Sequence, residues 1–192
     1  MKIYKTGTVP FYTNRLHLRL FRTDDAAEMF TAYANDPAVT KYLRWNAHRE
    51  VTETWGILNT WVPQYADGDF YQWVVCLKET GELIGSISAF EVQEEEHKAE
   101  DTLEIGYCFG QKYWGNGYAT EAMRGVLTYL SMWGYQNFVA VHAKPNLASG
   151  KVMQKVGMRK IGETVYTKMD GTTKVEAFVY KANVSGLRLS DV

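Results

Sequence analysis

"LEIGYCFGQKYWGNGYATEA" occupies residues 103–122 and joins three local patterns in one continuous run. Apolar residues alternate through its first part, from Leu103 to Phe109, as they do in a β-strand. Gly115 and Gly117 follow, and a run of good helix formers begins at about Tyr118. The stretch therefore predicts a strand, a glycine turn and the start of a helix.

The glycine turn admits two interpretations. The first amides of a helix have no intrahelical partner, and the helix dipole leaves that end partly positive. Glycines let a backbone approach an anion closely, so the turn could cradle a phosphate. A flexible turn without a ligand would use the same residues, and the spacing leaves both interpretations open. The spacing differs from G-x-G-x-x-G, which argues against a dinucleotide fold.

The rest of the chain continues this alternation of strands and helices, in the order β-α-α-β-β-β-α-β-α-β-β. The expected strands are residues 16–21, 70–77, 83–92, 103–109, 137–143, 158–168 and 173–181. The expected helices are residues 26–34, about 49–65, the segment from the glycine turn to about 133, and 146–156. Thr23-Asp24-Asp25 resembles an N-cap, and Asp36-Pro37 a helix stop. Hairpins beside βαβ crossovers predict an α/β (α+β mixed sheet) fold with helices on its faces, in one domain spanning residues 1–192.

Composition excludes several classes of protein. The chain has 192 residues, 46% hydrophobic and 22% charged, which is typical of a soluble domain. Net charge is −1, and no lysine- or arginine-rich block suggests a nucleic-acid partner. Cys76 and Cys108 lie in apolar strands as expected of reduced, buried thiols, and no apolar stretch suggests a leader or a membrane span. We expect a cytoplasmic protein with no nucleic-acid or membrane partner.

Two regions have both a structural and a functional interpretation. Aromatic residues make up 14% of the chain and could fill the core or wall a substrate cleft. The acidic segment QEEEHKAED, residues 93–101, is expected to be a solvated loop, although its charge could also attract a cationic substrate.

Three motifs carry a resemblance to a known family. Glu104-Ile105-Gly106-Tyr107 lies in the strand, Lys112-x-x-Gly115-x-Gly117-Tyr118-Ala119 follows it, and Asn146-Leu147-Ala148-Ser149 precedes Lys155-Val156-Gly157-Met158. The glycine motif resembles the acetyl-CoA pyrophosphate loop of the GNAT N-acetyltransferases, Gln/Arg-x-x-Gly-x-Gly/Ala. The other motifs, with RLHLRLFRTDDAAEMF and YLRWNAHREVTETW, resemble the RimJ/RimL-like branch over nearly the whole chain. Lys112 replaces the usual Gln or Arg, and Met158 the usual Phe.

This resemblance implies the GNAT acyl-CoA N-acyltransferase fold, a twisted mixed sheet of about seven strands that splays between the fourth and fifth. It also implies that the pantetheine arm of acetyl-CoA pairs with the backbone of the fourth strand and that the glycine loop holds the pyrophosphate. No metal is implied. The residues expected to bind the cosubstrate are Ile105, Gly106, Tyr107, Lys112, Trp114, Gly115, Asn116, Gly117, Tyr118, Ala119, Thr120, Asn146 and Ser149.

Acetyl transfer to an amine calls for a base, an oxyanion donor and an acid beside the sulfur. Strand alternation places Glu104 on the face opposite Leu103 and Ile105, where it could act as the base directly or through a water. His142 is a second candidate base. The resemblance implies that Ser149 protonates the departing thiolate. The glutamate that some relatives carry in the next strand is absent, since residues 139–141 read Val-Ala-Val.

The implied activity is an acetyl-CoA-dependent N-acetyltransferase that acts by direct attack in a ternary complex, without a cysteine nucleophile. The acceptor could be a protein N-terminal amine or a small-molecule amine. We expect Tyr42, Trp45, Trp55 and Trp61 to wall its side of the site. A non-catalytic acyl-CoA sensor is the alternative, and the resemblance also allows a homodimer through the C-terminal strands.

Overall fold

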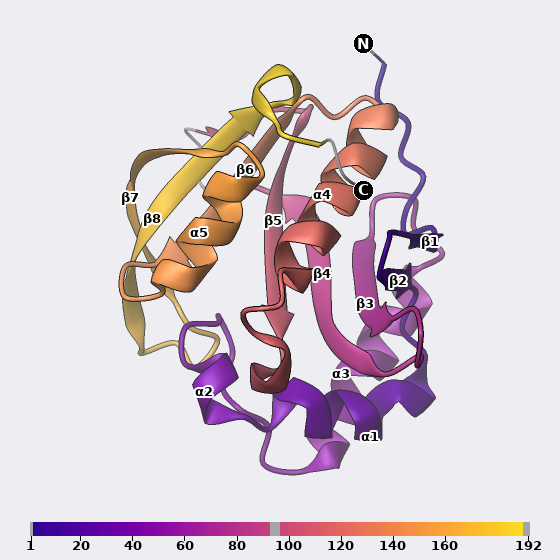
Figure 1. The fold of residues 1–192 in the computed structure, drawn as a ribbon. Coiled ribbons are helices and arrows are strands. Elements are labelled where there is room, and N and C mark those ends of the chain that lie inside the picture. Colours follow the sequence, from indigo (N-terminus) through magenta and orange to yellow (C-terminus); the bar gives the residue numbers. More distant parts are fainter. Residues whose placement is uncertain (1, 93–96, 190–192) are drawn as a thin grey trace.

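In the part of the chain that the structure describes, eight strands form one mixed sheet in the order β1-β2-β3-β4-β5-β6-β8-β7 (Figure 1). The computed structural model describes residues 2–92 and 97–189. The strands are β1 Phe11–Tyr12, β2 Leu16–Arg19, β3 Tyr71–Leu77, β4 Leu83–Glu91, β5 Thr102–Phe109, β6 Asn137–Ala143, β7 Arg159–Thr167 and β8 Lys174–Asn183. The mixed sheet is confirmed. The eighth strand is β1, whose two residues are too few to show a strand periodicity.

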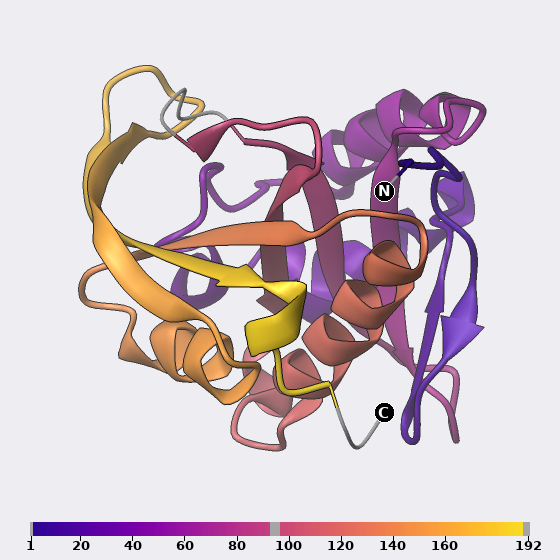
Figure 2. The ribbon, with the colours of Figure 1, turned by 90° about the horizontal axis from the view of Figure 1, so that it is seen from above.

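Helices cover both faces of this sheet, as expected. They are α1 Ala26–Met29, α2 Pro37–Thr40, α3 Val51–Gln64, α4 Tyr118–Met132 and α5 Leu147–Lys155. Figure 2 shows α4 and α5 on one face, with α1 and α3 on the other. The expected continuous helix over residues 26–34 is wrong in part, because α1 passes into a π-helical turn at Phe30–Ala34. Asp36 ends that segment and caps α2, which the sequence analysis missed.

The central strands are buried on both faces. In β3, Tyr71, Trp73 and Val75 pack into the core beneath α4 and α5. Val74 and Cys76 point to the opposite face and pack into the core beneath α1 and α3. A strand covered by helices on both sides carries a continuous apolar run rather than a strict alternation.

The acidic segment expected between β4 and β5 is described only in part. Residues 93–96 of the expected acidic loop lie outside the described residues, and residues 97–101 contain no strand. Within the described part of the chain, no helix has both the length and the apolar character needed to cross a membrane.

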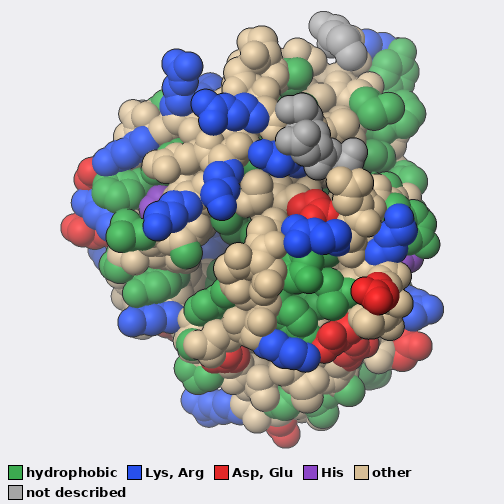
Figure 3. All heavy atoms as spheres, in the orientation of Figure 1, with side chains coloured by type: hydrophobic (Ala, Val, Ile, Leu, Met, Phe, Trp, Pro, Cys, Tyr) green, Lys and Arg blue, Asp and Glu red, His purple; other side chains and the backbone are tan. Residues whose placement is uncertain are grey.

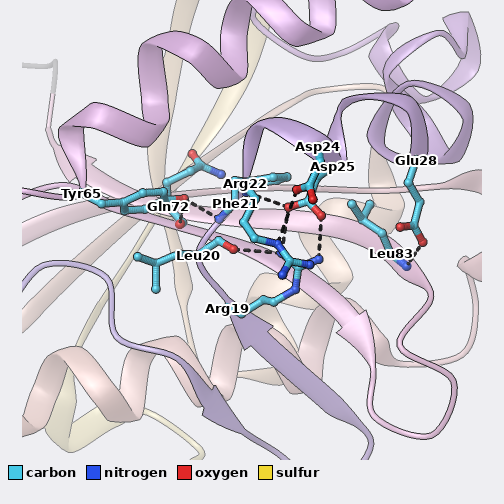
Figure 4. A network of polar contacts seen from close by, with 10 residues as sticks. All are labelled: Arg19, Leu20, Phe21, Arg22, Asp24, Asp25, Glu28, Tyr65, Gln72 and Leu83. Atoms are coloured by element: carbon cyan, nitrogen blue, oxygen red, sulfur yellow. Dashed lines mark hydrogen bonds and ion pairs between the residues drawn. The ribbon is translucent and has the colours of Figure 1, made fainter.

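A buried ion pair connects β2 to the start of α1, in the helical layer formed by α1 and α3 (Figure 4). The two terminal guanidinium nitrogens of Arg19 donate to the two carboxylate oxygens of Asp25, both at 2.8 Å. The same carboxylate accepts from the backbone amide of Arg22. The N-cap position is therefore Arg22, rather than a residue of Thr23-Asp24-Asp25 as expected. Glu28 extends the network by accepting from the amide of Leu83, at the start of β4. Charge-assisted bonds thus join β2, α1 and β4.

Helix α5 packs closely on β6 where a glycine faces a histidine. A Cβ added at Gly150 would lie 2.6 Å from Nε2 of His142, so only glycine fits there without displacement of the ring. Nδ1 of His142 donates to the carbonyl of Ala143 at 2.9 Å, which leaves Nε2 as the unprotonated nitrogen of the neutral ring. Burial lowers the pKa of His142 below its ordinary value.

We predict that Asp25→Ala lowers the free energy of unfolding by about 3 kcal/mol, because it leaves the Arg19 guanidinium largely buried without its partner. Urea denaturation measures this change. Asp24→Ala is the matched control, because Asp24 is 79% exposed at the side chain and should change stability by less than about 0.5 kcal/mol. Equal effects of the two substitutions would contradict the assigned role.

We also predict a pH dependence of stability that involves His142. Above its ordinary pKa of 6.5, the ring is neutral in both the folded and unfolded states. As the pH falls below that value, the unfolded chain takes up a proton before the folded one, and the free energy of unfolding decreases. Urea denaturation at several pH values between about 7.5 and 5 measures this free energy. It should fall less steeply with decreasing pH for His142→Gln than for the wild type. The same slope in both proteins would exclude this contribution.

Candidate active site

The sheet opens between β5 and β6, which pair in parallel. Their pairing runs only from Thr102–Asn137 to Glu104–Val139. Beyond this point β5 remains paired with β4 as far as Phe109, while β6 remains paired with β8. The edge of β5 over residues 105–109 therefore has no strand partner on the β6 side. This is the expected splay, at the fourth and fifth of the strands that the sequence predicted.

The glycine loop lies directly after this open edge. Gly115 and Gly117 adopt φ values of +80° and +81°, in the left-handed region that favours glycine. A Cβ added at Gly115 would meet no atom within 4 Å, so the space above the backbone is open. In α4, the amide of Glu121 makes the first intrahelical bond, to the carbonyl of Gly117. The three preceding amides, of residues 118–120, are thus the donors that a helix start offers to an anion.

Side chains hold the loop in place. Nε1 of Trp114 donates to the carbonyl of Phe109 at 2.7 Å, and the Asn116 amide donates to the carbonyl of Tyr113 at 3.2 Å. Lys112, which was expected at the phosphate, is paired with Glu82 at 3.0 Å on the exposed surface. The hydroxyl of Tyr113 donates to that same carboxylate.

A basic hollow of about 480 Å³ adjoins the loop at the first turns of α4. Arg15, Arg124 and Lys155 contribute cationic side chains to its lining, beside Gly117. Arg15 is fixed there, because its Nε donates to buried Glu121 at 2.7 Å. Lys and Arg side chains spread across this face of the molecule (Figure 3). The hollow therefore suits a ligand with several negative charges.

Glu104 occupies the end of the β5–β6 pairing and is 3% exposed. Its Oε1 accepts from Nη2 of Arg44 at 3.1 Å. Leu103 and Ile105 pack into the core beneath α4 and α5, so Glu104 points to the opposite face, as alternation predicted. Arg44 was missed by the sequence analysis. It comes from the segment between α2 and α3, and only the charge within YLRW could have drawn attention to it.

Ser149 lies beneath the other side of the opening, in the first turn of α5. Asn146 caps this helix by accepting from the Ser149 amide at 3.3 Å. The Ser149 hydroxyl lies 2.8 Å from the hydroxyl of Tyr107 on β5. The Tyr107 hydroxyl is also 3.0 Å from the Ser149 carbonyl, to which it can donate. Burial raises the pKa of Tyr107 well above its ordinary value, so the phenol keeps its proton at neutral pH. This side-chain contact could not be read from the sequence.

Neither His142 nor Cys108 is placed to take part with Glu104 and Ser149. His142 points away from Glu104, and Cys108 is a neutral thiol. His142 faces Gly150 beneath α5, on the side of the sheet away from Glu104, whereas its neighbour Val141 faces the Glu104 side. Burial raises the pKa of Cys108 to about 11, which leaves it a neutral thiol near pH 7. Among residues 2–92 and 97–189, no cluster of three or more His, Cys, Asp or Glu side chains could hold a metal ion.

On the Glu104 side, a cavity of about 420 Å³ lies between the sheet and the helices of the first layer. We call it the aromatic cavity, because its lining includes Tyr33, Tyr42, Trp45, Trp61, Phe90 and Tyr166. Three of the four aromatic residues expected on the acceptor side thus line one cavity. The expectation for Trp55 is wrong, because its side chain points outward from α3 and the residue is 55% exposed.

Comparisons with known proteins agree with this geometry. The family described as acetyltransferase (GNAT) domain matches residues 15–159. The "Uncharacterized N-acetyltransferase YoaA" of Bacillus subtilis (strain 168) is 30% identical over 151 residues, which cover 78% of this chain and 82% of that protein. A GNAT-family acetyltransferase structure from Bacillus anthracis has a TM-score of 0.75 and 26% identity, over 91% of this chain and 98% of the other.

The fold is also that of Mycobacterium smegmatis RimJ in complex with CoA-disulfide. The TM-score is 0.75 at 22% identity, over 88% of this chain and 82% of RimJ. Sequence, sheet topology and glycine loop lead to the same assignment: the chain belongs to the GNAT acetyltransferase family.

Proposed function

We propose that the protein transfers the acetyl group of acetyl-CoA to a primary amine by direct attack in a ternary complex. The observation that carries the proposal is the position of Glu104 and Ser149. They lie on either side of the β5–β6 opening, close to a glycine loop suited to phosphates. An amine can approach from the aromatic cavity and a thioester along the opening.

Three features fit acetyl-CoA. The edge of β5 beyond Glu104 offers backbone groups that the amides of a pantetheine arm can pair with, as an added strand would. Loop residues 114–120 offer amides and open space to a pyrophosphate. Arg124 and Lys155 lie in the adjoining hollow, where they can balance further phosphate charge, whereas Arg15 is paired with Glu121 there. Lys112 can contribute only if it leaves Glu82.

The reaction then needs two proton transfers. Glu104 accepts a proton from the amine, directly or through a water, while the amine nitrogen forms a bond to the thioester carbon. The carbon–sulfur bond breaks, and Ser149 gives its hydroxyl proton to the leaving thiolate. Tyr107, whose buried phenol remains protonated and lies 2.8 Å from the Ser149 oxygen, can donate a hydrogen bond to that oxygen as it loses its proton, and solvent returns a proton to Ser149 once the products leave. We therefore propose that Tyr107 acts with Ser149 as one unit.

A purified sample tests the activity by release of free thiol from acetyl-CoA in the presence of amines. Two acceptor classes are to be compared: peptides with free N-terminal amines and small-molecule amines. CoA binding without thiol release for any acceptor would instead support the alternative, a non-catalytic acyl-CoA sensor. A homodimer through the C-terminal strands stays a prediction from the family resemblance, and a cytoplasmic location stays a prediction from the composition and cysteine content.

We predict that Gly117→Asp weakens CoA binding at least about tenfold more than Gly117→Asn, because a carboxylate there would repel the pyrophosphate. The two side chains have nearly the same shape, and both tolerate the left-handed backbone better than most residues. Isothermal titration with CoA measures the difference. Equal affinities would remove Gly117 from the phosphate site.

We predict that Ser149→Ala lowers kcat by about 10²- to 10⁴-fold, the range expected when an acid catalyst is removed, with less than about a threefold change in CoA affinity. Tyr107→Phe should lower kcat in the same direction. If the two hydroxyls act as one unit, the double variant will be no slower than Ser149→Ala alone. Steady-state kinetics of the three variants test this, and multiplicative losses would show that the hydroxyls act independently.

A further inference from the structure

The aromatic cavity has the dimensions of a small-molecule site. Its volume of about 420 Å³ falls within the range of pockets that enclose compact ligands. Its walls are largely aromatic and apolar, with a few polar groups placed among them. Tyr33 is fully buried in the wall, and Trp45 and Trp61 are partly buried. Such a cavity selects an apolar body and positions it by a few polar contacts.

The charged groups that line the cavity are one carboxylate and one guanidinium. Among the described residues that line it, Glu104 supplies the only carboxyl group and Arg44 the only cationic side chain. Their side chains differ in burial, with Glu104 at 4% and Arg44 at 34% exposed. The guanidinium is therefore the more accessible of the two. A cavity with both signs of charge is complementary to a ligand that carries both.

Arg44 is held in position from two sides. Its backbone carbonyl accepts from the amide of Met169 at 2.7 Å, and its guanidinium lies 5.0 Å from the ring centre of Tyr166. Tyr166 in turn donates to the carbonyl of Tyr42 at 2.6 Å. These contacts join the end of the β7–β8 hairpin to the segment around residue 44. They give the guanidinium a fixed place in the cavity wall before any ligand arrives.

The guanidinium keeps donors for a ligand. An arginine carries five N–H donors in a planar fork that matches a carboxylate. Within residues 2–92 and 97–189, its side chain donates only to Glu104, through Nη2. A ligand carboxylate can thus bind the remaining donors from this position and share the guanidinium with Glu104. The weaker ion pair would make Glu104 a stronger base toward the amine than it is when Arg44 pairs with it alone.

We infer that the acceptor is an amino acid or a close analogue, with a free carboxylate beside its amine and an apolar side chain. The inference rests on the proposed acetyl transfer and deepens it. The carboxylate binds Arg44, the amine faces Glu104, and the side chain contacts the aromatic walls. A peptide N-terminus lacks this carboxylate, since its first carbonyl is a neutral amide. The geometry therefore favours the small-molecule acceptor over the protein N-terminus.

The test compares apolar L-amino acids with their amides, which keep the amine and side chain but lose the carboxylate. We expect kcat/KM to favour the acid by about 10- to 100-fold, as for a charge-assisted hydrogen bond, in the pairs that react. Arg44→Gln should remove this preference. If Arg44 only supported the fold, its substitution would slow acid and amide equally. Equal or faster transfer to the amides, or transfer only to peptide N-termini, would overturn the inference.

A binding measurement separates this inference from the proposed reaction. Trp45 and Trp61 line the cavity, so amino acid binding can be followed by tryptophan fluorescence without turnover. Binding that favours the acid and requires Arg44, together with no thiol release, would refute the reaction and keep the ligand class. Arg22→Gln is the matched control, because its side chain is 67% exposed and lies away from the cavity. Unchanged CoA affinity would show that Arg44→Gln remains folded.

Discussion

A strand edge that opens inside a sheet leaves backbone donors and acceptors without their usual ladder, and β5 presents such an edge beyond Glu104. The arrangement persists because each diverging strand has another partner: β4 stays with β5, and β8 stays with β6. The rest of the site is placed by this divergence. It brings Ser149 and Tyr107 to one face of the opening and Glu104 to the other.

The two faces of the sheet consequently differ in chemistry. The face under α4 and α5 begins at the glycine loop and is bordered by cationic groups. The face under α1 and α3 holds the aromatic cavity, with the ion pair between Arg44 and Glu104 in its wall. In the proposed reaction an anionic cosubstrate and an amine approach from opposite faces and meet where β5 and β6 separate. Neither ligand then has to pass through the binding region of the other.

The sequence predicted most of the fold because its signals are local. Strand alternation placed Glu104 on the correct face, and the helix expected over residues 146–156 corresponds to α5, Leu147–Lys155, with Asn146 as its N-cap. Contacts between distant segments could not be predicted in this way. Arg44 meets Glu104 across 60 residues of sequence, and Tyr107 meets Ser149 across 42. Trp55 was misplaced because an aromatic side chain in a predicted helix can face either the sheet or the solvent, and the sequence does not show which neighbour covers it.

The contacts between the β7–β8 hairpin and residues 40–42, beside the aromatic cavity, affect the order in which the enzyme folds. Lys168 donates to the carbonyl of Thr40 across 128 residues of sequence, and Tyr166 reaches Tyr42 across 124. Contacts of such long sequence separation pay their loop-closure entropy before they contribute stability, and they slow folding relative to local contacts. The glycine loop and α4, by contrast, are adjacent in sequence. During synthesis these contacts cannot form until the β7–β8 hairpin has left the ribosome, whereas the glycine loop can form before it.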